Sequence, residues 1–395
     1  MLEPVAPGSY LPRGFLRIGG MSVARQQLGL ALALTCERVI CLAQGLSAEL
    51  QELQQATESA GVQFTMITEP RQLLGLITAV DDLIVIGDGL FVSTADAAAM
   101  LEQGAGVLVQ PIEQGLAAGF ERIDLNHAAA ALMRIPGRLV ERIAELPADY
   151  DAVSALQRIA LQAGVPQRLI HGGAGEPLFW TLVRSEADAH ALEPQWIRQR
   201  TRADVSYSPA RAIALLAVRL FGPALLHAGS GAGVITIAAT IVALIAVSLG
   251  WLGYGAMALA CCALGWILRE FAAFLTRIEG DLPGVPRVID GRAVYGWSLD
   301  GVMIALSGWN MTPLAGQSPL DRYFPAMALI GVLRLLPRAL AGRWTAALQD
   351  RAALALLLLG ATAAGAVGLT VQLAAILLLV AGIVLPRGEV ILTQP

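Results

Sequence analysis

One long uncharged stretch constrains the fold of this chain most. Residues 231–268 contain no Asp, Glu, Arg or Lys, whereas charged residues recur every few positions through residues 1–210. A helix needs about 20 apolar residues to cross the hydrocarbon core of a bilayer, so the stretch is long enough for two crossings. The change in composition predicts a soluble N-terminal domain followed by an all-α polytopic membrane domain.

Six apolar segments in the second half of the chain are predicted as transmembrane helices. The third and the last are the shortest. The six are Val234–Leu249, Leu252–Leu268, Tyr295–Trp309, Tyr323–Leu340, Ala352–Leu369 and Val371–Leu385. All basic residues of the chain are arginines, and with six spans they gather in the loops of one side, with only Arg322 on the other. Basic loops stay in the cytoplasm, so both termini are expected there. The opening residues lack the features of a signal peptide, which agrees with this topology.

The segment before the first span is less apolar. Ser208–Ala228 contains Arg211, Arg219, Pro223 and His227. We interpret it as an amphipathic helix on the cytoplasmic surface of the membrane. A seventh span is the alternative, and it would move the N-terminal domain to the opposite side from the basic loops. The expected domains are thus residues 1–195, a linker with the juxtamembrane helix at 196–230, and a membrane domain at 231–395.

The N-terminal domain alternates short apolar runs with helical patterns. The predicted strands are Arg38–Ala43, Val62–Ile67 and Leu83–Ile86. The predicted helices are Ala48–Ser59, Gln72–Val80, Ala95–Glu102, Arg138–Glu145 and Val153–Ala163. Alternation of this kind is typical of an α/β fold with a parallel sheet and helices on both faces.

One strand end in this domain is a candidate site. Leu83–Ile86 runs into Gly87-Asp88-Gly89, and in open α/β sheets that position faces the ligand crevice. An aspartate there often holds a metal ion or a ribose. The alternative is that Asp88 and Gly89 only form a turn.

Two short motifs stand near the start of the chain, Pro12-Arg13 and Gly19-Gly20-Met21-Ser22. They resemble the Pro-Lys and Gly-Gly-Lys-Pro motifs of sugar-phosphate nucleotidyltransferases, whose domain has the GT-A fold, and the resemblance covers about residues 5–165. The resemblance implies nucleotide binding by Arg13, Gly19, Gly20 and Asp88, with a metal ion on Asp88. The family's Gly-rich phosphate loop is missing, and the chain has no lysine. We therefore expect a degenerate, GT-A-like domain.

The membrane half resembles CDP-alcohol phosphotransferases, which have a juxtamembrane helix and six spans. Their signature is D-x2-D-G-x2-A-R-x8-G-x3-D-x3-D, and Gly296 to Asp300 fits its G-x3-D part. The last aspartate falls on Ile304. If Arg277 is the signature arginine, the first two aspartates fall on Arg269 and Ala272.

The resemblance implies Mg2+ or Mn2+ on Asp300 if the protein is active, with Asp300 and Glu270 as the catalytic residues. Further nearby carboxylates that could substitute for missing ligands are Glu279, Asp281 and Asp290. Arg334, inside the fourth predicted span, is either functional or held by snorkelling or an ion pair.

The apolar segments predict a multi-pass membrane protein. The resemblance implies phospholipid or inositol-lipid head-group synthesis in a bacterial inner membrane, and the missing motif residues predict that the protein is catalytically degenerate. The alternatives are an active phosphotransferase with an altered metal site around Asp300, and a lipid-handling or transport protein on the same scaffold. The expected partners are membrane lipid, a CDP-alcohol or nucleotide, and a second copy or an active enzyme. The net charge of −4 gives no indication of nucleic-acid binding.

Overall fold

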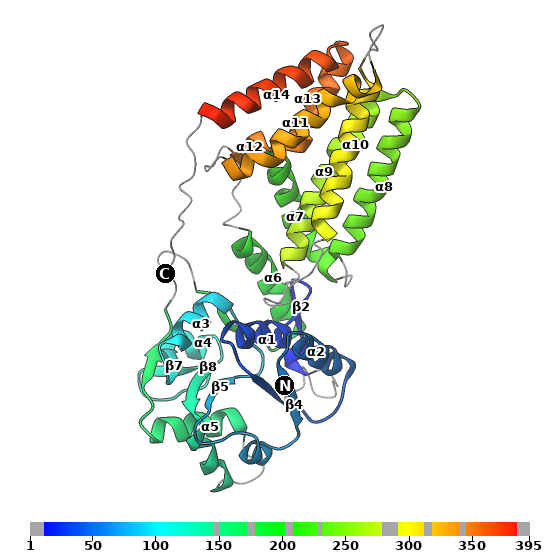
Figure 1. Ribbon diagram of the computed structural model, residues 1–395. Coiled ribbons are helices and arrows are strands. Elements are labelled where there is room, and N and C mark those ends of the chain that lie inside the picture. Colours follow the sequence, from blue (N-terminus) through cyan, green and yellow to red (C-terminus); the bar gives the residue numbers. More distant parts are fainter. Residues whose placement is uncertain are drawn as a thin grey trace. The chain divides into compact units, whose positions relative to one another are not determined.

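The computed structural model describes residues 12–145, 151–171, 178–201, 208–227, 231–278, 291–311, 318–339 and 345–384 (Figure 1). Contacts divide the chain into two units, one ending at Trp196 and the other beginning at Ile197. The N-terminal unit is an α/β fold with small sheets, and the C-terminal unit is helical.

The largest sheet of the N-terminal unit has four strands in the order β5-β8-β7-β9 (Figure 1). The strands are Asp82–Ile86 (β5), His127–Pro136 (β8), Gly106–Pro111 (β7) and Gln167–Leu169 (β9). β8 is antiparallel to both neighbours, while β9 is parallel to β7. The prediction of an all-parallel sheet is therefore wrong, because a reversed strand lies inside the sheet.

Composition explains why β8 is hard to recognise. It begins with His127 and four alanines, and alanine is depleted in strands. Ala128 and Ala130 are fully buried. A side chain at Gly115 in α4 (Ile112–Ala117) would collide with the methyl group of Ala128, so small residues are needed on both sides of this contact. Close packing, and not strand propensity, places alanine here.

The first predicted strand–helix–strand unit is confirmed. β3 (Arg38–Leu42) and β4 (Gln63–Ile67) are parallel, and α2 (Ala48–Ser59) connects them. The Ser47 side chain accepts the Leu50 N–H and so caps α2. The predicted helix at Gln72–Val80 is wrong, since only a 3-10 helix, η2 (Pro70–Gly75), forms there.

The remaining elements of this unit complete the chain order. They are η1 (Arg13–Phe15), β1 (Arg17–Ile18), β2 (Met21–Ser22), α1 (Val23–Ala33), β6 (Leu90–Val92), α3 (Thr94–Glu102), η3 (Gly137–Glu145), α5 (Ala152–Gln162), β10 (Trp180–Leu182) and α6 (Glu186–Arg200). The predicted helices at 95–102 and 153–163 are thus confirmed as α3 and α5, and the one at 138–145 forms as the 3-10 helix η3.

The helical unit contains α7 (Pro209–His227), α8 (Gly231–Trp251), α9 (Gly255–Ile278), α10 (Gly291–Trp309), α11 (Pro319–Ala339), α12 (Thr345–Leu348), α13 (Arg351–Ala363) and α14 (Val367–Val384). Among the described residues, α8, α9 and α14 are long and apolar enough to cross a membrane, and α13 is a shorter apolar helix. These properties are compatible with a membrane-embedded unit.

One predicted span has the wrong boundaries. The apolar run Ala352–Leu369 breaks at Gly365, which has a φ of 67°. The N–H groups of Gly365 and Ala366 donate to the carbonyls of Thr362 and Ala361, which is the Schellman arrangement that ends a helix. α13 therefore stops at Ala363, and the last helix begins at Val367, four residues earlier than predicted.

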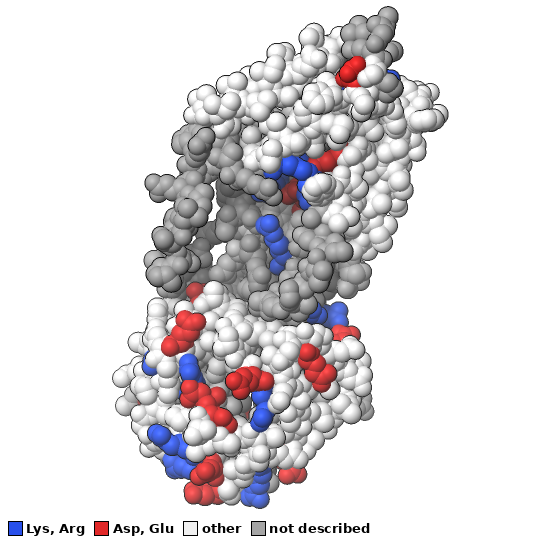
Figure 2. All heavy atoms as spheres, viewed as in Figure 1, with Lys and Arg blue, Asp and Glu red and all other residues white. Residues whose placement is uncertain are grey.

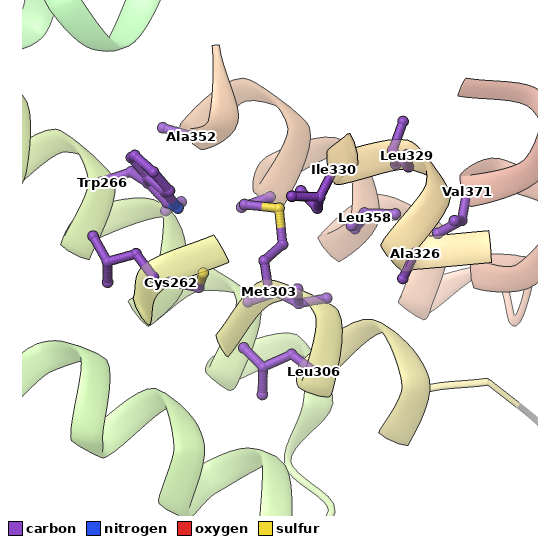
Figure 3. Packing of buried hydrophobic residues seen from close by; sticks show 14 of the residues in the cluster. Cys262, Trp266, Met303, Leu306, Ala326, Leu329, Ile330, Ala352, Leu358 and Val371 are labelled. Atoms are coloured by element: carbon purple, nitrogen blue, oxygen red, sulfur yellow. The ribbon is translucent and has the colours of Figure 1, made fainter. Parts of the chain in front are cut away.

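The core of the helical unit joins helices that are distant in the sequence. Figure 3 shows Cys262 and Trp266 of α9, Met303 of α10, Ile330 of α11 and Leu358 of α13 packed together. Many other apolar side chains of the helical unit are exposed. The exposed ones include Ile237, Leu244, Leu357, Leu373 and Leu377. An apolar exterior around a packed core is what a bilayer requires.

The predicted juxtamembrane helix is present as α7. Its small residues Ala210, Ala214 and Val218 are buried, while Leu216 and Leu220 are exposed. The structure fixes the helix, and its position at the membrane surface stays a prediction.

Candidate functional site

Asp300 is a buried carboxylate in the helical unit. It lies on α10 among the buried residues Leu299 and Met303, and only 3% of its surface is exposed. Two arginines donate to it: Arg334 Nε to Oδ2 at 2.7 Å, and Arg351 Nε to Oδ1 at 3.0 Å. Both carboxylate oxygens are thus bound by guanidinium groups through short, charge-assisted hydrogen bonds.

The two arginines are held by tryptophans. The Arg334 guanidinium carbon lies 4.4 Å from the centroid of the Trp297 ring, and Trp297 precedes Asp300 by three residues on α10. Arg351 lies 5.3 Å from the Trp266 ring. Stacking of this kind fixes the planar guanidinium groups in place. The sequence leaves Arg334 as either a functional residue or one held by snorkelling or an ion pair, and the structure shows an ion pair with Asp300.

Glu270 belongs to a second ionic group. Its Oε2 accepts from Arg211 Nε at 3.2 Å, and its Oε1 accepts from Arg269 Nη1 at 2.9 Å. Arg269 lies 5.1 Å from the centroid of Trp266, the same ring that Arg351 contacts. The two predicted catalytic carboxylates are therefore each bound by arginines, and Trp266 connects the two groups.

Gly296, the glycine of the G-x3-D match, has a packing role. A Cβ built on it would lie 3.0 Å from Arg269 Nη2. The missing side chain lets the Arg269 guanidinium lie directly against α10. The glycine and Asp300 are one turn apart, so they place the two ionic groups along one helix.

Three polar atoms around these groups are buried and have no hydrogen-bond partner within the described parts of the chain. They are Trp266 Nε1, Arg269 Nε and the Tyr295 hydroxyl. The Trp266 side chain is 5% exposed. Each of the three can donate a hydrogen bond.

Asp350 joins two helix starts beside this site. Its Oδ2 accepts from the Ser208 hydroxyl at 2.7 Å and the Ala210 N–H at 2.8 Å, and its Oδ1 accepts from the Ala353 N–H at 3.0 Å. One carboxylate thereby caps α7 and α13 together. The fixed start of α13 positions the neighbouring Arg351.

Figure 2 shows a group of positive and negative atoms gathered on a largely uncharged helical unit. The groups around Trp266 contribute four arginines and two carboxylates, and Asp350 beside them adds a third carboxylate, so a formal excess of one positive charge remains. No motif in the sequence marks Arg211, Arg351, Trp266 or Asp350 as site residues. The one sequence signal for the arginines is their position within or beside apolar segments, where a charged residue needs a partner.

The predicted nucleotide-binding residues lie at two separate turns of the N-terminal unit. Gly19 and Gly20, with φ of 60° and 79°, form the β1–β2 turn. The Gly19 N–H donates to Glu193 Oε1 of α6 at 2.9 Å, and Glu193 is 3% exposed. A carboxylate of the chain itself thus accepts the N–H of Gly19, a residue that the resemblance assigns to nucleotide binding. Arg13 lies in η1, one turn before β1.

Asp88 lies in the turn between β5 and β6. Gln27 Nε2 donates to the carbonyls of Gly87 and Leu90 on either side of it. Gly89 has a φ of 71°, and a Cβ there would lie 2.5 Å from the Val183 carbonyl oxygen. Both features are those of a tightly packed turn, and a turn is the alternative to a ligand site for Asp88 and Gly89.

No protein-family model matches the chain, and no curated protein is significantly similar to it. The two resemblances therefore rest on the quoted motifs alone.

A divalent metal ion does not fit the residues around Asp300. Magnesium and manganese prefer several oxygen ligands, and both oxygens of Asp300 face guanidinium groups. Among the described residues, no three His, Cys, Asp or Glu side chains gather in a way that could hold a metal. Glu279, Asp281 and Asp290 lie outside the described residues. We therefore derive no metal-dependent step at this site.

Proposed function

We propose that this chain is a membrane protein of lipid head-group metabolism that binds its ligand without turning it over. The observation that carries the proposal is the pairing of both Asp300 oxygens with Arg334 and Arg351. A two-metal phosphotransferase needs its carboxylates free to bind cations and to accept a proton. Here the two candidate carboxylates neutralise arginines instead.

Binding without catalysis fits a role beside an active enzyme. The helical unit keeps a cationic site, and the N-terminal unit keeps a glycine turn whose Gly19 N–H is bound by Glu193. The Gly-rich loop that would supply backbone donors for a triphosphate in a nucleotidyltransferase is missing from the sequence. Both halves thus favour a non-catalytic homologue of the two-domain enzymes that it resembles.

We further propose six spans, α8, α9, α10, α11, α13 and α14, in a bacterial inner membrane with both termini in the cytoplasm. The placement of arginines in the loops of one side supports this topology. Arg322 is the exception, and its contacts give it a structural role. Arg322 donates to the carbonyls of Gly308, Trp309 and Met311 at the end of α10, so it acts as a helix cap. α13, with 13 residues, is about 20 Å long and is the shortest of the six.

Labelling of single cysteines tests this topology. In a background in which the four native cysteines are replaced, Leu252→Cys and Leu320→Cys should react with a membrane-impermeant maleimide added to intact cells. Leu348→Cys should react only after the cells are broken. The reverse pattern, or labelling of Leu348→Cys in intact cells, would contradict six spans with cytoplasmic termini.

Turnover is tested with the purified protein in detergent, CDP-diacylglycerol, candidate alcohols and Mn2+. We expect no CMP above the protein-free level, while an active CDP-alcohol phosphotransferase run in parallel releases it. Proteins that co-purify with the tagged chain from solubilised membranes should release CMP, whereas the purified chain alone should not. Release of CMP by the purified chain that Asp300→Asn abolishes would refute the proposal in favour of an active enzyme. Lipid transfer between vesicles without chemical change would favour a lipid-handling protein.

A further inference from the structure

The helical unit contains hydrogen-bond donors that lack acceptors. Trp266 Nε1 and Arg269 Nε are buried without a partner among the described residues. A buried donor without an acceptor costs free energy, so such groups usually mark a bound water, ion or ligand. The two residues are neighbours, since the Arg269 guanidinium carbon lies 5.1 Å from the Trp266 ring.

The charges nearby favour an anion over water. The Arg269 and Arg351 guanidinium carbons lie 5.1 and 5.3 Å from the centroid of the Trp266 ring. Two positive charges therefore lie beside one side chain of a largely apolar unit, where charge interactions are weakly screened. Glu270, Asp300 and the nearby Asp350 offset part of this charge, yet Arg211 and Arg334 bind Glu270 and Asp300 as well, so four arginines stand against three carboxylates. A bound anion would neutralise the remaining excess and accept from the unpartnered donors.

A phosphate group has the right chemistry for this place. It offers several acceptor oxygens and no obligatory donor, and guanidinium groups match its geometry. The Tyr295 hydroxyl, in the first half of α10, is also buried without a partner in the part of the chain that the structure describes, and it is a further donor. Gly296 leaves the Arg269 guanidinium close against α10.

We propose that Trp266, Arg269 and Arg351 form a binding site for the phosphate group of a phosphate ester. This inference deepens the proposed function, on which it rests, by naming the ligand class of the helical unit. The phosphate group can belong to a lipid head group or to a soluble ester, and the test separates the two.

The test uses the full chain in neutral detergent at constant ionic strength, with chloride as the only other anion. Inorganic phosphate, glycerol 3-phosphate and dihexanoyl phosphatidic acid are titrated in separate arms, and dihexanoyl phosphatidylcholine, a zwitterion, serves as a comparison. Calorimetry reports the dissociation constants. We expect saturable binding in at least one of the three phosphate arms. Binding of phosphatidic acid alone identifies a lipid head group, whereas binding of glycerol 3-phosphate identifies a soluble ester.

Conservative variants locate the site. Trp266→Phe keeps an aromatic ring for the arginines but removes the Nε1 donor, so affinity should fall about tenfold or more. Gly296→Ala should weaken binding several-fold by displacing the Arg269 guanidinium. Trp297→Phe is the matched control, because Trp297 contacts Arg334 through its ring and is 64% exposed. Its affinity should stay within about twofold of the parent's.

Several results would overturn the inference. One is the absence of binding in all three phosphate arms with protein that elutes as a folded, monodisperse species. Another is an equal loss of affinity in Trp266→Phe and Trp297→Phe. A third is displacement of the ligand by chloride at equal charge, which would indicate unspecific anion binding. Release of CMP by the purified chain would refute the proposed function. It would not refute the phosphate site, which depends on the measured affinity.

Discussion

Replacement of Asp300 by asparagine should destabilise the helical unit strongly. The substitution keeps the size of the side chain and removes the negative charge between Arg334 and Arg351. Two guanidinium groups then share a buried site without a counter-ion. Loss of one partner from a fully buried ion pair costs about 3–5 kcal/mol. The side chains of Arg334 and Arg351 are 30% and 16% exposed, so we expect the lower end, about 3 kcal/mol.

Thermal unfolding in detergent, followed by tryptophan fluorescence, measures this effect. For a unit of this size, about 3 kcal/mol corresponds to a fall in Tm of about 6–12 °C. Asp321→Asn is the control, because Asp321 is an exposed carboxylate at the start of α11 that accepts the Ser318 N–H. Its effect should be about 1 kcal/mol or less.

A double variant sharpens the interpretation. Arg334→Gln added to Asp300→Asn removes one of the uncompensated charges, so it should recover part of the lost stability instead of adding to the loss. An Asp300→Asn protein as stable as Asp321→Asn would refute the reasoning. A gain in stability would refute it more strongly, because catalytic residues are often held at a cost to stability.

Three further predictions concern other parts of the chain. Gly89→Ala should destabilise the N-terminal unit by about 2–4 kcal/mol in denaturant unfolding, since a positive φ and a contact with the Val183 carbonyl oxygen combine there. Gly61→Ala, with a positive φ in open space, should cost only about 1 kcal/mol, and equal losses would count against this account. Burial raises the pKa of the Cys41 thiol from 9.0 to about 11, so its alkylation at pH 8 should be about a hundredfold slower than that of an ordinary thiol. Stability should then fall as the pH rises from about 9 toward 11, because the unfolded thiol ionises first, and fast alkylation of the folded protein would contradict this. Arg322→Met removes the cap of α10 and should cost about 1–3 kcal/mol in thermal unfolding, whereas an unchanged Tm would show that the cap is dispensable.

Local signals account for the elements that the sequence predicted well. α2 has the predicted bounds, because Ser47 caps it and its apolar residues recur on one face. β8 was missed because its alanines carry no strand preference and its partners β5 and β7 are set by tertiary packing. The break at Gly365 was missed since glycines are common inside transmembrane helices and do not by themselves mark a helix end.

The site, too, could be predicted only where its residues are set by local sequence. The burial of Asp300 in a span was predictable from the apolar residues around it. Its partners were not, because Arg334 and Arg351 lie 34 and 51 residues away and their approach depends on how the helices pack. The contact of Arg269 with Trp266 follows from their three-residue spacing on α9. The contact of Arg351 with the same ring has no sequence signature, because it depends on how α9 and α13 pack.

Electron paramagnetic resonance of Mn2+ tests most directly whether Asp300 is an ion-pair residue or a metal ligand. The parent protein and Asp300→Asn are titrated with Mn2+ in detergent, and the signal of the free aquo ion is recorded. The ion-pair account predicts the same free signal for both proteins, because Arg334 and Arg351 occupy the carboxylate. Stoichiometric loss of the free signal in the parent, absent in Asp300→Asn, would show that Asp300 binds metal and would contradict the account.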